Sequence, residues 1–240
     1  MAIRSSWRVV RCRGSRTPFC RRLEEDSTLR WRDQYCPKVM KPDGMKLGIE
    51  AARLLAAADC CETAPGLSEI EFQRIEQEYG IEFADDHRAF LASGLPVSQP
   101  PEEGDTWEKP WPDWRNGDPE GLRERLEWPV EGVALSVRRG YWHPSWGQRP
   151  EDADEALRQA QALLARVPKL VPVYGHRFLP AGHGSHGHPV LSVWGTDMIC
   201  YGNDLVDYVN HEFDDFDAHT PDDWRPQATV SFWRDFLPRT

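Results

Sequence analysis

Residues 170–201 read LVPVYGHRFLPAGHGSHGHPVLSVWGTDMICY, and this stretch decides the fold. Short runs rich in Val, Leu and aromatic residues alternate with Gly-rich breaks, which is the pattern of β-strands joined by turns. It predicts strands over residues 170–174, 177–179, 190–194 and 198–201. Because such closely spaced strands pair with their neighbours through tight turns, we expect a small, mainly antiparallel sheet.

Helices are predicted well before the sheet. Residues 46–61 form an Ala/Leu-rich segment typical of a helix. Ser68 and Glu71 have the spacing of a capping box, in which the hydroxyl and the carboxylate each bind an unpaired backbone N–H. Apolar side chains then recur on one face as far as Gly80. The pattern predicts a helix from Ser68 to Gly80.

Four more segments lie between this helix and the strands. Asp85 is expected to cap a second short helix. Six prolines in residues 96–119 predict a long irregular loop, and residues 121–137 read as two short helical turns split by Pro129. Ala, Leu and Val recur every three or four positions through residues 152–167, which predicts an amphipathic helix.

Helices are also expected after the sheet. Asn203 or Asp204 can cap a helix over residues 205–213, and a terminal helix is predicted over residues 231–237. With helices on both sides of the strands and no internal repeat, the fold class is α+β. We expect a helix pair, then the small sheet, with flanking helices.

Composition restricts the class of protein. The 240 residues are 40% hydrophobic with a mean hydropathy of -0.65, enough for one domain or two. No stretch approaches the roughly 18 apolar residues that span a bilayer, which excludes a membrane protein. The six Cys show no Cys-x-x-Cys pairing, and no secretory segment is present. Reduced thiols and a cytoplasmic location are therefore expected.

The net charge of -10 is unevenly distributed. Residues 1–44 hold eleven Lys/Arg and five Asp/Glu, so residues 45–240 carry -16. The first part is predicted to be a disordered basic extension: a transit peptide, a nucleic-acid-binding arm, or sequence ahead of a true start at Met45. Residues 45–240 are predicted to be one domain with its core in about 66–213. Their acidity repels nucleic acid and membranes and attracts basic partners, or only keeps the protein soluble.

Two groups of histidines are candidate chemical sites. His183, His186 and His188 could bind zinc or copper, although three His among glycines are more typical of a mobile turn. His176 and His211 could meet two carboxylates, those of Asp204 and Asp207, as an acid/base set. The sequence has no nucleophile elbow, phosphate loop, Rossmann glycine run or His-Glu-x-x-His motif. We therefore expect no catalytic residues, metal or cofactor.

Aromatic residues form the third candidate group. Tryptophans are common anchors at interfaces, but beside prolines they also pin irregular segments to a core. Both interpretations apply to Trp107, Trp111, Trp114, Tyr141, Trp142 and Trp146.

Residues 66–91, GLSEIEFQRIEQEYGIEFADDHRAFL, resemble the entry of the SUKH superfamily of Smi/Knr-like domains. There a helix of the form L-t-x-x-E-I-x-x-x-E-x-x-x-G leads to l-P-x-d-y-x-x-F-L. Segments 170–180, 189–193 and 204–208 are similar to the sheet and closing helix of bacterial members. Ala84 replaces the usual Pro of the second motif.

The resemblance implies a binding scaffold. Many bacterial relatives are immunity proteins that neutralise toxins, often nucleases, while fungal relatives regulate cell-wall synthesis. The acidity of residues 45–240 suits a basic partner. We expect a protein partner and no direct binding of nucleic acid or membranes. The alternatives are a His-dependent hydrolase or metalloenzyme, and a housekeeping regulatory binding protein. The densest carboxylate cluster, the candidate partner site, is Glu212, Asp214, Asp215, Asp217, Asp222 and Asp223.

Overall fold

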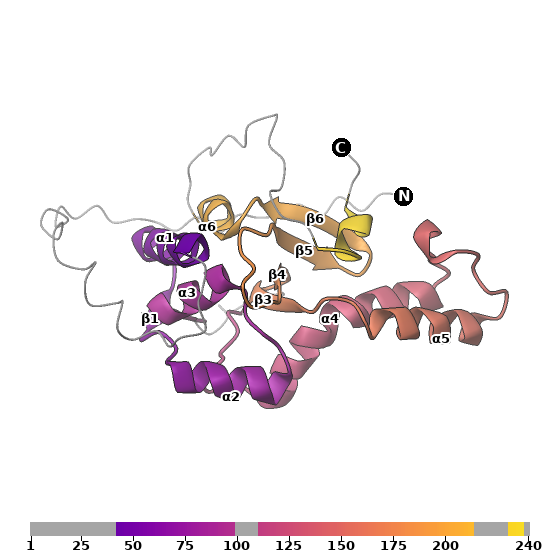
Figure 1. Cartoon of the computed structure of the whole chain (residues 1–240), viewed down its shortest axis with the longest axis horizontal. Coiled ribbons are helices and arrows are strands. Elements are labelled where there is room, and N and C mark those ends of the chain that lie inside the picture. The colour runs from indigo at the N-terminus through magenta and orange to yellow at the C-terminus, as the bar shows by residue number, and fades with distance from the viewer. Residues whose placement is uncertain (1–41, 99–109, 214–229, 238–240) are drawn as a thin grey trace, which may run out of the picture. The chain divides into compact units, whose positions relative to one another are not determined.

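Four antiparallel strands form where the sequence predicts them. The computed structural model describes residues 42–98, 110–213 and 230–237, all within the unit Lys38–Thr240. The sheet order is β3-β4-β5-β6, so each strand pairs with the next along the chain (Figure 1). The strands are β3 (Leu170–Tyr174), β4 (Arg177–Pro180), β5 (Val190–Trp194) and β6 (Asp197–Gly202).

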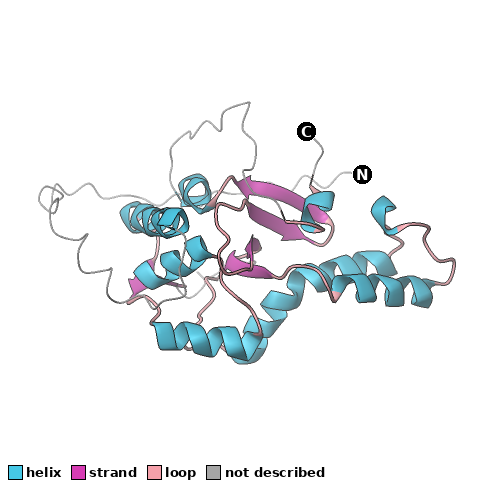
Figure 2. Cartoon of the chain, viewed as in Figure 1, coloured by secondary structure: helices cyan, strands magenta, loops and turns pink. Residues whose placement is uncertain are grey.

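Helices precede and follow these strands, which confirms the α+β class (Figure 2). None of the helices in the described ranges is long and apolar enough to cross a membrane. Two three-residue strands that the sequence did not predict pair with each other, β1 (Glu62–Ala64) and β2 (Leu95–Val97). The helices are α1 (Pro42–Ala58), α2 (Glu69–Tyr79), α3 (Asp85–Ser93), α4 (Pro119–Arg138), α5 (Ala153–Leu164) and α6 (Leu205–Phe213), with 3-10 turns η1 (Pro144–Trp146) and η2 (Trp233–Phe236).

The capping box at α2 is confirmed. The Glu71 N–H donates to Ser68 Oγ, and the Ser68 N–H donates to Glu71 Oε2 at 2.8 Å. Gly80 ends the helix in the left-handed conformation, with φ 59°, which glycine adopts without steric cost. Both ends of α2 are therefore encoded locally.

The prediction that Asp85 caps α3 is wrong. Ala84 occupies the N-cap position and makes no side-chain bond, while the first helical N–H, that of Asp85, donates to Ser185 O at 2.8 Å. The β4–β5 loop thus caps the helix with its own backbone. The Asp85 carboxylate binds that loop in turn, accepting from Gly184 N–H at 3.0 Å.

The predicted break at Pro129 is also wrong, because α4 runs unbroken from Pro119 to Arg138. Asp118 caps its first turn, accepting from Gly121 N–H at 2.7 Å. The axis of α4 changes direction along its length (Figure 1), as expected where a proline removes one helical hydrogen bond. Pro129 is itself buried, and Val133 and Val137 beyond it are buried too. Tertiary burial therefore holds together a helix that proline weakens.

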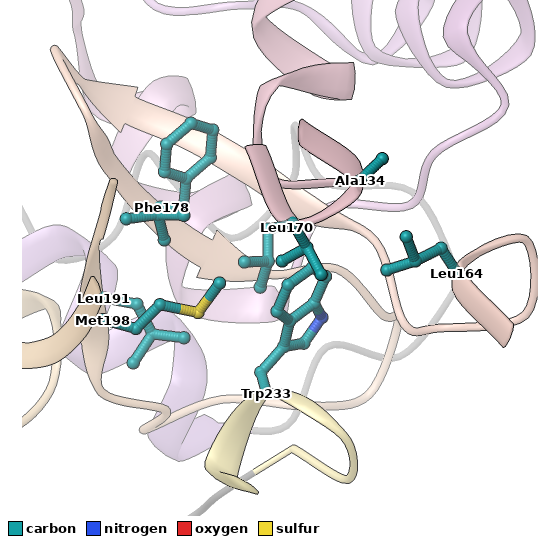
Figure 3. Packing of buried hydrophobic residues seen from close by; sticks show 9 residues of the cluster. Ala134, Leu164, Leu170, Phe178, Leu191, Met198 and Trp233 are labelled. Carbon is teal, nitrogen blue, oxygen red and sulfur yellow. The ribbon is translucent and has the colours of Figure 1, made fainter. Parts of the chain in front are cut away.

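The main core lies between one face of the sheet and helices α4 and α5 (Figure 3). The indole of Trp233 in η2 lies among these side chains and donates its N–H to Pro168 O at 2.6 Å. The terminal helix expected over residues 231–237 is thus one 3-10 turn, held by a buried aromatic. The cluster is Val133, Ala134, Leu164, Leu170, Phe178, Leu191, Val193, Met198 and Trp233.

Helices α1 and α3 approach each other at Gly48. A Cβ added there would lie 2.1 Å from Asp86 O and 2.7 Å from Ala89 Cβ. The clash involves backbone, which cannot move without separating the two helices. We expect Gly48→Ala to lower the free energy of unfolding by about 1–3 kcal/mol, despite the better helix propensity of Ala.

Urea unfolding followed by circular dichroism measures this change. Gly121→Ala is the matched control, because its Cβ would meet only a side-chain atom, the Asp118 Oδ2, at 3.3 Å. Equal stability of the Gly48→Ala protein and the wild type would contradict the packing of α1 on α3.

Candidate functional site

The three loop histidines lie in the β4–β5 connection, which is hydrogen-bonded to α3. Gly187 N–H donates to Asp86 Oδ2 at 2.8 Å, and Gly182 N–H donates to Glu82 O at 2.8 Å. His183 Nδ1 lies 3.8 Å from Asp85 Oδ1. The carboxylates of α3 therefore bind the loop mainly through its backbone amides. We call this contact, of Asp85 and Asp86 with residues 182–187, the loop clasp.

The loop clasp has the composition of a metal site without its geometry. In residues 42–98, 110–213 and 230–237, no three His, Cys, Asp or Glu side chains are grouped so that they could hold a metal ion. The lone pairs of the two aspartates face backbone N–H groups instead. Its chemistry is that of a structural contact between a helix and a loop.

Two members of the candidate acid/base set lie at the start of α6. Asp204 accepts hydrogen bonds from Val206 and Asp207 N–H, both at 2.9 Å, and Asp207 accepts from Asn203 N–H at 2.8 Å. These two carboxylates cap α6, and their meeting with His176 and His211 stays a prediction. The ring of His211 lies 4.9 Å from that of Tyr201, a member of a second cluster.

That second cluster is centred on Arg177, a buried residue of β4. Its guanidinium is bound to His176 Nε2, donates to Ser192 Oγ at 3.0 Å, and pairs with Glu212 Oε2 at 3.3 Å. Its Cζ lies 3.6 Å from the centroid of the Tyr201 ring. We call these five residues the Arg177 cluster. The sequence patterns point to His176 and Glu212 but not to Arg177. The one signal for Arg177 is that it is a charged residue within a strand whose other residues are apolar and buried.

The Arg177 cluster joins the sheet to α6. Burial raises the pKa of the neighbouring Tyr174 to about 12 and that of Tyr208 well above its usual value, so both phenols stay protonated. The Ser192 hydroxyl accepts from a guanidinium, which cannot act as a base. The charge of Arg177 is balanced by Glu212 inside the fold.

Two exposed tryptophans lie where α4 packs against β5 and the turns of the sheet. Trp128 of α4 is 42% exposed and Trp194 of β5 is 49% exposed. Their ring centroids are 5.4 Å apart with an interplanar angle of 59°. The Trp128 indole N–H donates to Val193 O at 3.4 Å, which directs its ring toward the strand. We call Trp128 and Trp194 the tryptophan pair.

Beneath the tryptophan pair, the backbone of α4 packs closely against the β5–β6 turn. A Cβ on Gly132 of α4 would lie 2.9 Å from Gly195 Cα in the β5–β6 turn. Gly195 has φ 62°, a conformation suited to glycine. Arg125 donates to Gly175 O in the β3–β4 turn at 3.1 Å. Contacts with both turns fix the helix relative to the sheet, so the two rings are positioned in advance of any partner.

Acidic side chains flank the tryptophan pair. Glu124 and Glu131 are exposed and lie one helical turn before and after Trp128, so they share its face of α4. Asp197 is exposed and pairs with Trp194 across the strands. The Arg125 guanidinium donates hydrogen bonds to the carbonyl groups of Pro110 and Gly175, and burial lowers the pKa of Arg125 to about 10. The surroundings are therefore negative.

The tryptophans chosen from the sequence lie elsewhere. Trp111 and Trp114 are buried, and Trp111 lies among the rings of Phe90, Tyr174 and Phe213. Trp142 and Trp146 are partly exposed and meet edge to face, with centroids 5.3 Å apart. Both members of the tryptophan pair were missed, because an aromatic in an amphipathic helix or strand is expected in the core. One signal could have indicated that Trp128 is exposed: its position in the sequence does not fit the helical spacing of the buried residues of α4.

The predicted acidic cluster is only partly described. The Glu212 side chain is 9% exposed and paired with Arg177, so it belongs to the fold. Trp107 and the five aspartates Asp214, Asp215, Asp217, Asp222 and Asp223 lie outside the described residues. Their role as a partner site stays a prediction.

Asp86 of the loop clasp and the adjacent His87 have opposite pKa shifts. Burial raises the pKa of Asp86 from 3.8 to about 6, although hydrogen bonds from the Gly187 and His87 N–H groups oppose this. Burial lowers the pKa of His87 from 6.5 to about 3. Folded Asp86 holds its proton more tightly than the unfolded chain, so its contribution to stability grows as pH falls from about 6 to 3.8. For His87 the unfolded chain binds the proton first, so stability is lost as pH falls below 6.5.

The free energy of unfolding changes with pH by at most about 1.4 kcal/mol per pH unit for each group. The contributions of Asp86 and His87 have opposite sign and cancel between about pH 6 and 4. We expect Asp86→Asn to lose stability relative to wild type as the pH falls through this window. His87→Leu should gain stability there. Urea unfolding at several pH values measures both differences. Parallel stability curves for the three proteins would contradict the opposed shifts.

No family model, curated protein or solved structure matches this chain. The resemblance of residues 66–91 to the SUKH entry motif rests on the sequence alone.

Proposed function

We propose that residues 45–240 form a non-enzymatic domain that binds a basic protein. The observation that carries the proposal is the tryptophan pair, two large aromatic rings held in place yet nearly half exposed. Tryptophan is enriched among the residues that dominate binding energy at interfaces. Rings that are already positioned lose little conformational freedom on binding.

Charge supports the choice of a basic partner. Residues 45–240 carry -16, and exposed carboxylates of Glu124, Glu131 and Asp197 flank the pair. Complementary charge raises the rate of association and disfavours acidic competitors such as nucleic acid. In its narrower form the proposal follows the SUKH resemblance: the domain is an immunity protein that neutralises a toxin such as a basic nuclease. A toxin gene beside the coding sequence would support this form over a housekeeping regulator.

Catalysis is the weaker alternative. The polar groups that a His-dependent hydrolase would use are engaged within the fold: His176 with Arg177, and Asp204 and Asp207 as helix caps. A metalloenzyme built on His183, His186 and His188 remains a separate hypothesis. Stoichiometric zinc in the purified protein, removed by His→Ala substitution at these positions, would favour it over binding.

The test uses the full chain as bait, followed by affinity measurements on the recovered partner. We expect a basic protein whose dissociation constant rises about tenfold or more between low salt and about 0.3 M salt. Trp128→Ala and Trp194→Ala should each weaken the complex by about 2 kcal/mol, the scale of an interface anchor.

Trp142→Ala is the control, since Trp142 is a partly exposed tryptophan paired with Trp146 near η1. The proposal fails if no partner is recovered, if affinity is indifferent to salt, or if the Trp142 variant weakens binding as much as the other two.

A further inference from the structure

We propose that the tryptophan pair is a seat for one lysine or arginine side chain of the partner. The proposal rests on the proposed function and names the chemistry that this surface recognises. The cation would lie against the exposed ring faces, with the carboxylates of Glu124, Glu131 and Asp197 around it.

Ring geometry supports a cation rather than an aromatic or aliphatic group. At 59° and 5.4 Å the two rings are tilted, so neither covers the face of the other. Each ring keeps a large exposed fraction, 42% for Trp128 and 49% for Trp194. The face of an aromatic ring is its negative pole, and tryptophan attracts cations more strongly than the other aromatic residues.

The surrounding charges favour the same occupant. Glu124 and Glu131 lie on the Trp128 face of α4, and Asp197 on β6 is the cross-strand partner of Trp194. Of the neighbouring basic side chains, Arg125 is held by the carbonyls of Pro110 and Gly175, and Arg123 pairs with Glu78. The ring of His176 lies 6.3 Å from that of Trp194, between centroids, and is bound to Arg177. Phosphate groups would meet three carboxylates, which argues against nucleic acid. A second copy would bring the same carboxylates to the contact.

Gly132 is a positioning residue for the seat. The contact of Gly132 with Gly195 sets the distance between α4 and the strand that carries Trp194. A methyl group there must displace the β5–β6 turn, because its nearest neighbours are backbone atoms at 2.9 and 3.1 Å. Gly132→Ala should therefore weaken cation binding without removing either ring. Gly121→Ala, at the other end of α4, should not.

The experiment is fluorine NMR of the full chain labelled with 5-fluorotryptophan, with resonances assigned through single Trp→Phe variants. The probe is a blocked tetra-arginine peptide, compared with tetra-citrulline, which has nearly the same shape and no charge. We expect the Trp128 and Trp194 signals to shift with tetra-arginine and not with tetra-citrulline. Trp128→Leu or Trp194→Leu should weaken binding about fivefold, and the Phe variants less.

Three results would overturn the seat. Equal shifts with tetra-citrulline would show that charge plays no part. Shifts confined to other tryptophans would place cation binding elsewhere. Shifts of Trp128 and Trp194 that follow protein concentration would assign the surface to self-association. The two proposals can fail separately. A basic partner that binds the wild type and the Leu variants equally well would reject the seat, while the proposed binding of a basic protein would stand.

Discussion

The burial of four consecutive polar residues, Asp85 to Arg88, is the constraint on which the rest of the structure depends. Buried charges are tolerated only when they are paired or hydrogen-bonded. Asp85 and Asp86 meet this requirement with amides of the β4–β5 loop, and Arg88 meets it with Glu69 and Glu76 of α2, at 2.7 and 2.9 Å. Since α1 packs on the same helix through Gly48, α3 connects α1, α2 and the sheet.

A second polar contact joins the sheet to α6. Arg177 binds Glu212 of α6 and Ser192 of β5, so the closing helix is held by a charge pair as well as by apolar packing. Removing one partner of such a buried pair leaves an uncompensated charge, which is costly. Most of the residue types that suggested chemistry in the sequence are thus used to join elements. The exposed tryptophan pair and its neighbouring carboxylates lie apart from these contacts.

How much the sequence predicted depends on how local each signal is. The capping box of α2, the four strands and the 3.6-residue pattern of α5 depend on neighbours within a few positions, and these predictions are confirmed. The cap of α3 failed because its partner, Ser185, lies in a loop about a hundred residues away. The break at Pro129 failed because burial of α4 outweighs the lost hydrogen bond. The strands β1 and β2 are too short to give a pattern.

By itself the sequence determined the α+β class, most of the helices and strands, and the acidity of residues 45–240, because these follow from composition and short-range periodicity. Only the tertiary structure decided which polar residues are free to act. It placed Asp204 and Asp207 at a cap and His183 beside Asp85 of α3. It also brought Trp128 and Trp194 together from elements more than sixty residues apart, through contacts of α4 with the turns of the sheet. The physical reason is that side-chain pairing over such separations depends on packing between elements, which no local pattern encodes.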